Sequence, residues 1–288
     1  MKGGYPDTIR LLVDSYPTLT PELKKAARFM VEHPEEVGLS SMRSLASGAG
    51  VKPATITRLT KKLGFNGYED LREPFKQRLR TRSPDFVAKV QDIQQRSAKG
   101  NEAILKDLRA QEIANIERSL SDDQIARLDS AAQIVHDSER LYVLGLRGSH
   151  AAAFLFHYTY QLFKDNSHLL DTGAGIFADQ IRSIGADDCL LVVSFPPYTQ
   201  LTIDAVDYAA DAGARIVAIT DSVISPAANA AAATIVTANT SPSFYHSFTG
   251  AVAVVQALIT ILVAKAGGNA ITTVEDTEKQ LSRVSAYW

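Results

Sequence analysis

Residues 42–63, MRSLASGAGVKPATITRLTKKL, decide the fold of the first third of this 288-residue chain. Apolar residues recur at helical spacing in both halves of the stretch: Leu45 and Ala49, then Ile56 and Leu59. Gly50 stands between the halves, where a tight turn needs a positive φ that glycine adopts without strain. The stretch therefore predicts two short helices that meet at an angle around a turn, with Val51 filling the angle between them.

The second of these helices has a basic outward face. No Asp or Glu lies between Val51 and Leu63. Arginine can read guanine through two hydrogen bonds, and lysine neutralises phosphate. We therefore predict a DNA-binding helix-turn-helix, in which the first part of the second helix faces the bases and its end faces the backbone: Lys52, Thr55, Thr57 and Arg58, then Lys61 and Lys62. The alternative is a solvated basic helix in a small bundle.

Charge is distributed unevenly along the chain. Residues 1–82 hold 15 Lys and Arg against nine Asp and Glu, a net charge of +6. Residues 83–288 hold 15 against 23, a net charge of −8, so the whole chain carries only −2. This asymmetry is expected when one end of a protein meets phosphates, and it favours double-stranded DNA as a partner over the solvated-helix alternative.

Helical patterns continue beyond the basic helix, and an alternating pattern then begins at Arg140. Further helices are predicted over 21–33, 68–80, 85–98, 102–119 and 121–136. Continuous apolar runs, typical of parallel strands covered on both faces, follow at 141–144, 167–171, 189–194, 215–220 and 234–237. Helices are expected between the first four runs and over 247–266. The fold class is an all-α domain (1–82), a helical connector (83–127) and an α/β domain with a doubly wound five-stranded parallel sheet (128–288).

Both halves of the chain resemble one known family. From Leu19 to Leu79 the chain is similar to RpiR-type bacterial regulators, on the residues Val51-Lys52-Pro53-Ala54-Thr55-Ile56-Thr57-Arg58 and then Lys62-Leu63-Gly64-Phe65-Asn66-Gly67-Tyr68 and Leu71. Lysine stands at position 52, where the family usually has serine. Residues 128–266 resemble the sugar isomerase (SIS) domain of the same family. The resemblance implies a homodimer or homotetramer that binds a palindromic operator.

The resemblance also indicates a ligand site. Ligands of open α/β sheets bind beyond the carboxyl ends of the strands, and in SIS domains two loops there, GxGxS and SxSGxT, hold the phosphate of a phosphosugar. Here they read Gly145-Leu146-Arg147-Gly148-Ser149 and Ser194-Phe195-Pro196-Pro197-Tyr198-Thr199. Proline removes two possible N–H donors, whereas arginine adds a fixed charge. The predicted ligand residues are Arg147, Ser149, Ser194, Tyr198, Thr199 and Thr172.

Several interpretations of this site remain open. The ligand is a phosphosugar or a carboxylated or otherwise anionic metabolite. Alternatively, the hydroxyls only cap helices, and Arg147 forms an ion pair at a subunit interface. For His246, before the last long helix, the resemblance to SIS proteins leaves a ligand role near a neighbouring subunit open, but a surface position is favoured.

The preferred function is a transcriptional regulator controlled by a small anionic metabolite, and not an enzyme. The runner-up is a sugar-phosphate isomerase or related enzyme. For that reaction the loops offer Asp171 and Asp221 but no obvious glutamate or histidine pair as general base. A ligand-independent architectural protein is a third, disfavoured class.

Composition favours the cytoplasm. Cys189, the only cysteine, lies in an apolar run and is expected to be a buried thiol in a reducing compartment. The first ten residues lack the apolar segment of a signal peptide, and residues 249–264 read as a buried helix, so no membrane contact is expected. No metal or cofactor is expected either, because no Cys/His cluster has the spacing of metal ligands.

Overall fold

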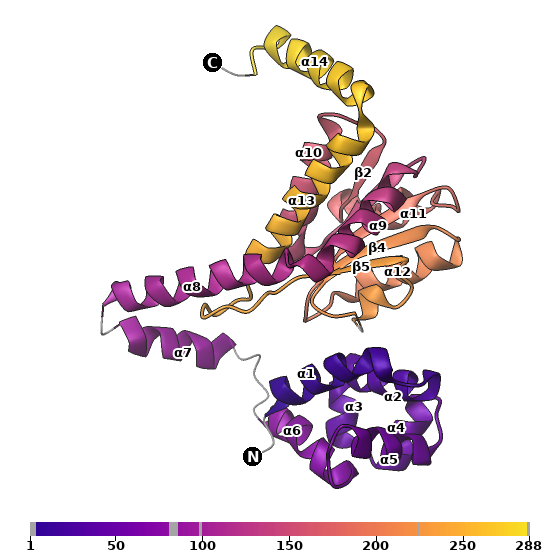
Figure 1. The fold of residues 1–288 in the computed structure, drawn as a ribbon, viewed down its shortest axis with the longest axis vertical. Coiled ribbons are helices and arrows are strands. Elements are labelled where there is room, and N and C mark those ends of the chain that lie inside the picture. Colours follow the sequence, from indigo (N-terminus) through magenta and orange to yellow (C-terminus); the bar gives the residue numbers. More distant parts are fainter. Residues whose placement is uncertain (1–3, 81–85, 98–99, 224, 287–288) are drawn as a thin grey trace. The chain divides into compact units, whose positions relative to one another are not determined.

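The computed structural model describes residues 4–80, 86–97, 100–223 and 225–286, and it divides into two compact units. One unit consists mainly of residues 1–91, and the other mainly of residues 92–288 (Figure 1). The predicted boundary after residue 82 lies outside the described residues, and the boundary after residue 127 stays a prediction.

The elements of the first unit, within its described residues, are helices. They are α1 (Tyr5–Ser15), α2 (Pro21–Glu32), α3 (Pro34–Leu39), α4 (Met42–Gly48), α5 (Pro53–Lys62) and α6 (Tyr68–Arg80), with a 3-10 turn at Tyr16–Thr18. Proline in the first turn starts α1, α2, α3 and α5, because its missing N–H is not needed there. Ser41 caps α4 by accepting the amide of Ser44 at 3.3 Å. The apolar faces meet in one core that contains Leu12, Met30, Leu45, Ile56, Leu59, Leu71 and Phe75.

The second unit contains a parallel sheet. Its strands are β1 (Leu141–Leu144), β2 (Ser167–Leu170), β3 (Cys189–Val193), β4 (Arg215–Thr220) and β5 (Ala233–Val236), in the order β2-β1-β3-β4-β5. Its helices are α8 (Asn101–Ser119), α9 (Ile125–His136), α10 (His150–Gln161), α11 (Phe177–Ile181), α12 (Gln200–Asp211), α13 (Thr249–Ala266) and α14 (Gly268–Arg283), and α7 (Phe86–Ser97) precedes them.

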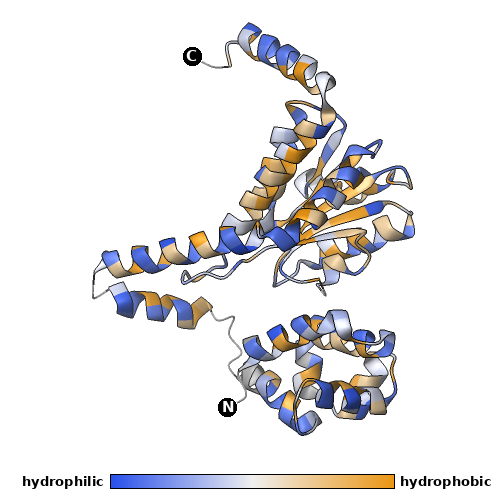
Figure 2. Ribbon diagram, in the orientation of Figure 1, coloured by the Kyte–Doolittle hydropathy of each residue, from blue (hydrophilic) through white to orange (hydrophobic). Residues whose placement is uncertain are grey.

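Helices cover both faces of the sheet, so two cores form. α9, α10 and α13 pack on the face that carries Val143, Leu191 and Val217, whereas α11 and α12 pack on the face that carries Leu144 and Val192. Successive strand residues point to opposite faces. Every residue of β1 and β3 is therefore buried, which explains their unbroken apolar runs (Figure 2). The predicted doubly wound sheet is confirmed.

One helix in the described part of the chain, Thr249–Ala266, is long and apolar enough to cross a membrane by length and composition. In this structure it is α13, and the residues on one side of it pack in the core above the sheet: Gly250, Ala251, Val254, Val255, Leu258 and Leu262. Only 33% of this helix is buried, so the predicted buried helix is confirmed for the side that faces the sheet and not for its whole surface.

Candidate functional site

The turn between α4 and α5 has the predicted geometry. Gly50 has φ of +62°, and its amide donates to the carbonyl of Ser47 at 3.1 Å. The amide of Val51 donates to the carbonyl of Ala46 at 2.9 Å, and its half-buried side chain packs against the helical core. A side chain at position 50 would be strained by the positive φ. The two helices are thus held as a helix-turn-helix.

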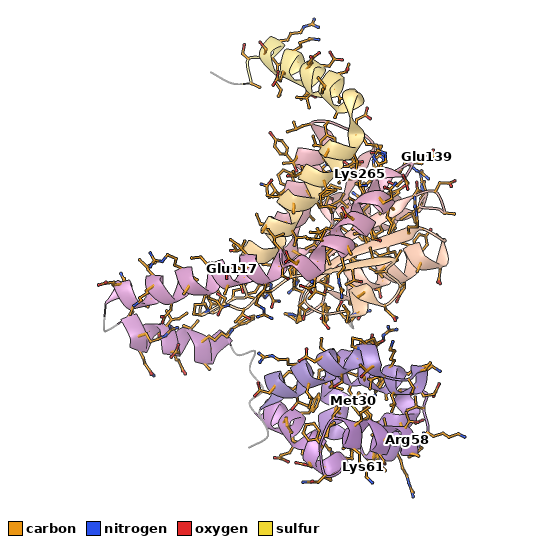
Figure 3. All side chains as sticks on the ribbon, viewed as in Figure 1. Met30, Arg58, Lys61, Glu117, Glu139 and Lys265 are labelled. Atoms are coloured by element: carbon orange, nitrogen blue, oxygen red, sulfur yellow. The ribbon has the colours of Figure 1, made fainter. Side chains whose placement is uncertain are left out.

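The outward face of α5 is basic and open to solvent. Lys52, Ala54, Arg58, Lys61 and Lys62 are exposed. Figure 3 shows Arg58 and Lys61 on the outside of the helical unit, while Met30 lies inside it. A row of cations without a neighbouring carboxylate in the helix matches the charge of a phosphate backbone.

Three of the predicted DNA-facing residues have other contacts within the unit. Thr55 is only 7% exposed, because it lies one turn before Leu59 on the inner side of α5, so the expectation that it faces DNA is corrected. The half-buried Thr57 donates to Met42 Sδ and to the Pro53 carbonyl, each at 3.4 Å. Lys62 remains exposed, but its Nζ donates to the Thr18 carbonyl at 2.8 Å.

The sequence interpretation omitted Arg43. This residue is exposed on α4, the first helix of the motif. A signal for it was present in the sequence, because the stretch without Asp or Glu runs from Val37 to Tyr68 and so includes both helices. Arg43 therefore joins Lys52, Arg58 and Lys61 as a candidate for DNA contact.

In the second unit, the strand order locates the candidate effector site. Order along the sheet reverses between β1 and β3, and ligands of such sheets bind beyond the strand ends at that switch point. The loop after β1 carries Arg147 and Ser149, and the loop after β3 carries Ser194 and Thr199. Thr172 is exposed in the loop after β2, one strand away from the switch point. We call the β1 and β3 loops the effector edge.

Two hydroxyls at the effector edge are not used for capping. Ser149 and Thr199 occupy the positions that precede α10 and α12, but neither side chain makes a capping hydrogen bond. Ser194 is buried, and its amide donates to the Ile219 carbonyl at 3.1 Å. The capping alternative therefore does not explain Ser149 or Thr199.

Arg147 has an unusual backbone conformation. Its side chain is exposed and its φ is +55°, in the left-handed region that favours glycine. In the GxGxS loop of the SIS domains that this unit resembles, glycine stands at this position. Backbone strain of this kind persists where the surrounding structure enforces it and is often found in functional loops.

Tyr198, in the loop after β3, is bonded to a carboxyl group that directly follows β4. Tyr198 donates its hydroxyl to Asp221 Oδ1 at 2.8 Å, and Thr220 donates to the same oxygen at 3.2 Å. Burial raises the pKa of the Asp221 carboxyl above its usual value, although both hydroxyl donors act in the opposite direction. Tyr198 is thus oriented by Asp221, a pairing that the sequence did not predict. Pro196 and Pro197 are exposed and joined by a cis peptide bond.

An aromatic cluster covers part of the effector edge. The Phe195 and Phe248 rings lie 5.7 Å apart, and Tyr245 stacks on His246 at 4.1 Å. His246, interpreted as a surface residue, is half-buried, and its Nε2 atom is buried. No group of three or more His, Cys, Asp or Glu residues suited to a metal ion occurs within the described ranges.

Comparisons with known proteins agree with this architecture. The family model described as "Helix-turn-helix domain, rpiR family" matches residues 8–82, and the SIS domain model matches residues 134–261. An uncharacterized HTH-type transcriptional regulator of Clostridium perfringens is 24% identical over 63% of each chain. HexR, an HTH-type transcriptional regulator of Pseudomonas aeruginosa, is 22% identical over 68% of this chain and 67% of its own length. The chain thus spans about 60–70% of these curated relatives.

Solved structures share the fold. The sugar isomerase domain of an RpiR transcription factor from Sphaerobacter thermophilus has a TM-score of 0.58 and 21% identity, covering 62% of this chain and 99% of its own. Vibrio vulnificus NanR complexed with ManNAc-6P has a TM-score of 0.54 and 19% identity, and the match covers 97% of this chain and 99% of the NanR chain. With a helix-turn-helix domain of the rpiR family followed by a SIS domain, the chain belongs to the RpiR-type proteins.

Proposed function

We propose that this protein is a DNA-binding transcriptional regulator and not an enzyme, with α5 as its recognition helix. The observation that carries the proposal is the exposed, acid-free face of α5 with Lys52, Arg58 and Lys61. Its similarity to proteins named as transcriptional regulators supports it. From the same similarity we propose that the protein is cytoplasmic and binds a palindromic operator as a homodimer or homotetramer. Light scattering of the free and DNA-bound protein tests the oligomeric state.

Salt dependence of duplex binding tests the DNA-binding part. Each phosphate neutralised by a cation contributes about −0.9 to the slope of log K against log salt. With Arg43, Lys52 and Lys61 as phosphate or base contacts, we expect a slope of about −2 to −3 per bound helix-turn-helix. Fluorescence anisotropy measures this slope on duplexes selected from a random-sequence pool, at salt concentrations from about 50 to 200 mM. Absence of binding to any duplex at low salt would contradict the proposal.

The SIS unit is proposed to bind a small anionic metabolite at the effector edge. Arg147 supplies the fixed positive charge, and Ser149 and Thr199 supply hydroxyls that make no helix-capping hydrogen bond. Two prolines stand where a phosphate-binding loop would offer N–H donors, which leaves both a phosphosugar and a carboxylated metabolite open. NanR was solved with ManNAc-6P, and that compound is therefore one of the probes to use.

Arg147→Ala is expected to abolish ligand binding without loss of stability. It removes the fixed positive charge, and a non-glycine residue keeps the left-handed backbone conformation, so the backbone strain is unchanged. A ligand at about 100 times its Kd stabilises by about 2.7 kcal/mol, a rise of roughly 5–10 °C in the Tm of a unit of this size. Thermal shift with ManNAc-6P, glucosamine 6-phosphate and a sugar acid measures both effects.

Arg147→Lys is the matched control, because it keeps the charge but loses the planar fork that binds an anion through two hydrogen bonds. We expect it to retain part of the shift. A full ligand-induced shift in Arg147→Ala would exclude this residue as the anchor. The isomerase alternative is tested in the same solutions: NMR of wild-type protein with glucosamine 6-phosphate or fructose 6-phosphate should show no new sugar phosphate.

A further inference from the structure

The segment 237–248, between β5 and α13, runs beside α8 (Figure 1) and is bonded to it. We call it the return segment. Ser247 donates to Glu112 Oε2 at 2.5 Å, Asn115 donates its side-chain amide to the Thr240 carbonyl at 2.7 Å, and the Ala238 amide donates to Ser119 Oγ at 2.9 Å. Asn115 and Ser119 are fully buried. Slippage between α8 and this segment would leave buried polar groups without partners, which is costly.

The first turn of α13 packs closely against both the return segment and α8. Gly250 is the second residue of this helix. A Cβ at this position would lie 2.5 Å from the Ala238 carbonyl oxygen and 2.5 Å from Ser119 Oγ. No side chain fits between them. α8, the return segment and the start of α13 therefore pack backbone against backbone, and a displacement of one cannot be absorbed by side-chain rotation alone.

The same segment contacts the effector edge with its aromatic rings. A Cβ on Gly148 would lie 2.9 Å from the ring of Phe248, the last residue of the return segment, and 3.1 Å from the Tyr245 hydroxyl. Phe248 also contacts Phe195, which belongs to the β3 loop. Both loops of the effector edge thus touch rings that lie next to Ser247, the residue bonded to Glu112.

We infer that the return segment couples the effector edge to α8. A ligand between the β1 and β3 loops has to share space with Tyr245 and Phe248, and any movement of these rings displaces Ser247 and Thr240. The hydrogen bonds to Glu112 and Asn115 then move or loosen α8. In sequence, α8 lies between the helix-turn-helix and the sheet. The consequence for DNA rests on the proposed regulator function, but the coupling within the SIS unit does not.

Hydrogen exchange of the full-length protein without ligand or DNA tests the coupling. Gly148→Ala places a methyl group against Phe248 and Tyr245 and so imitates an occupied effector edge. Amides of the α8 segment 108–119 should then exchange about threefold or more faster than in wild type. Gly185→Ala is the matched control, because its Cβ would meet only Asp188 Oδ2, at 4.0 Å, and the residue precedes β3 at the opposite edge of the sheet. It should leave α8 unchanged.

Ser247→Ala provides the reverse arm and a variant with a smaller structural change. Loss of the hydroxyl removes the bond to Glu112 and one acceptor for the Thr249 amide. Coupling is reciprocal, so exchange should rise both in α8 and in the segment 145–152, which comprises the β1 loop and the first turn of α10, on the far side of the rings. Unchanged α8 exchange in Gly148→Ala, or a Ser247→Ala effect confined to residues 247–250, would overturn the inference. A protein that fails to bind DNA would contradict the proposed function and leave this result standing.

Discussion

Arg58→Ala is expected to weaken binding to a selected duplex about 10- to 100-fold, while binding to random duplex falls by less than about threefold. Arg58 is exposed in the middle of α5, on the face opposite to the buried Ile56 and Leu59. A guanidinium that binds guanine through two hydrogen bonds contributes about 1–3 kcal/mol of discrimination between bases. Competition anisotropy with both duplexes at one salt concentration measures the two losses.

Lys61→Ala is the matched control on the same helix. Lys61 is also exposed, but it lies at the C-terminal end of α5 and its ammonium group has no planar fork. We expect a similar loss on every duplex and a salt slope reduced by about one per bound domain. Equal losses on selected and random DNA for Arg58→Ala would assign Arg58 to the phosphate backbone and remove the base-reading role.

The predicted part of the helical unit follows the apolar periodicity. α2 and α6 begin and end within one residue of their predicted limits, and α4 and α5 lie in the stretch 42–63 that predicts two short helices. α3 was not predicted, although Pro34 fits the first turn of a helix. Thr55 was placed outward from its residue type, although its spacing to Leu59 put it on the inner side. Where type and spacing disagree, the spacing decides the face.

The sheet could be predicted almost completely because burial on both faces leaves unbroken apolar runs. The chemistry at its edge could be predicted only in part. Position after β1 and β3 identifies Arg147 and Ser149, since strand ends meet at one edge. No local pattern links Glu112 to Ser247 or Tyr198 to Asp221, because these partners are far apart in the sequence and lie in different elements. The return segment has no periodicity, so the packing that places it against α8 was not predictable.

Arg140→Leu is expected to lower the free energy of unfolding of the SIS unit by about 3 kcal/mol, at the lower end of the range for a broken buried pair. The Asp188 side chain is 1% exposed, whereas that of Arg140 is 38% exposed, so water partly screens the pair. Arg140 donates from Nε to Asp188 Oδ1 at 3.0 Å and from Nη2 to Oδ2 at 2.8 Å. Without the guanidinium, Asp188 keeps the Gly185 amide but loses its charged partner. Urea unfolding followed by circular dichroism measures the change.

A second arginine–aspartate pair, which is exposed, is the control that separates the effect of burial on stability from the effect of charge. Arg182 and Asp179 lie 3.5 Å apart on the surface, with 73% and 64% of their side chains exposed. Arg182→Leu should change stability by less than about 0.5 kcal/mol, because an exposed pair gains little over hydration. Arg140 and Asp188 directly precede β1 and β3, at the sheet edge opposite to the effector edge. Their loss should therefore lower stability while ligand binding to the folded protein is retained. Equal effects of the two leucine variants would mean that water reaches Asp188 and that the pair does not hold these strand ends together.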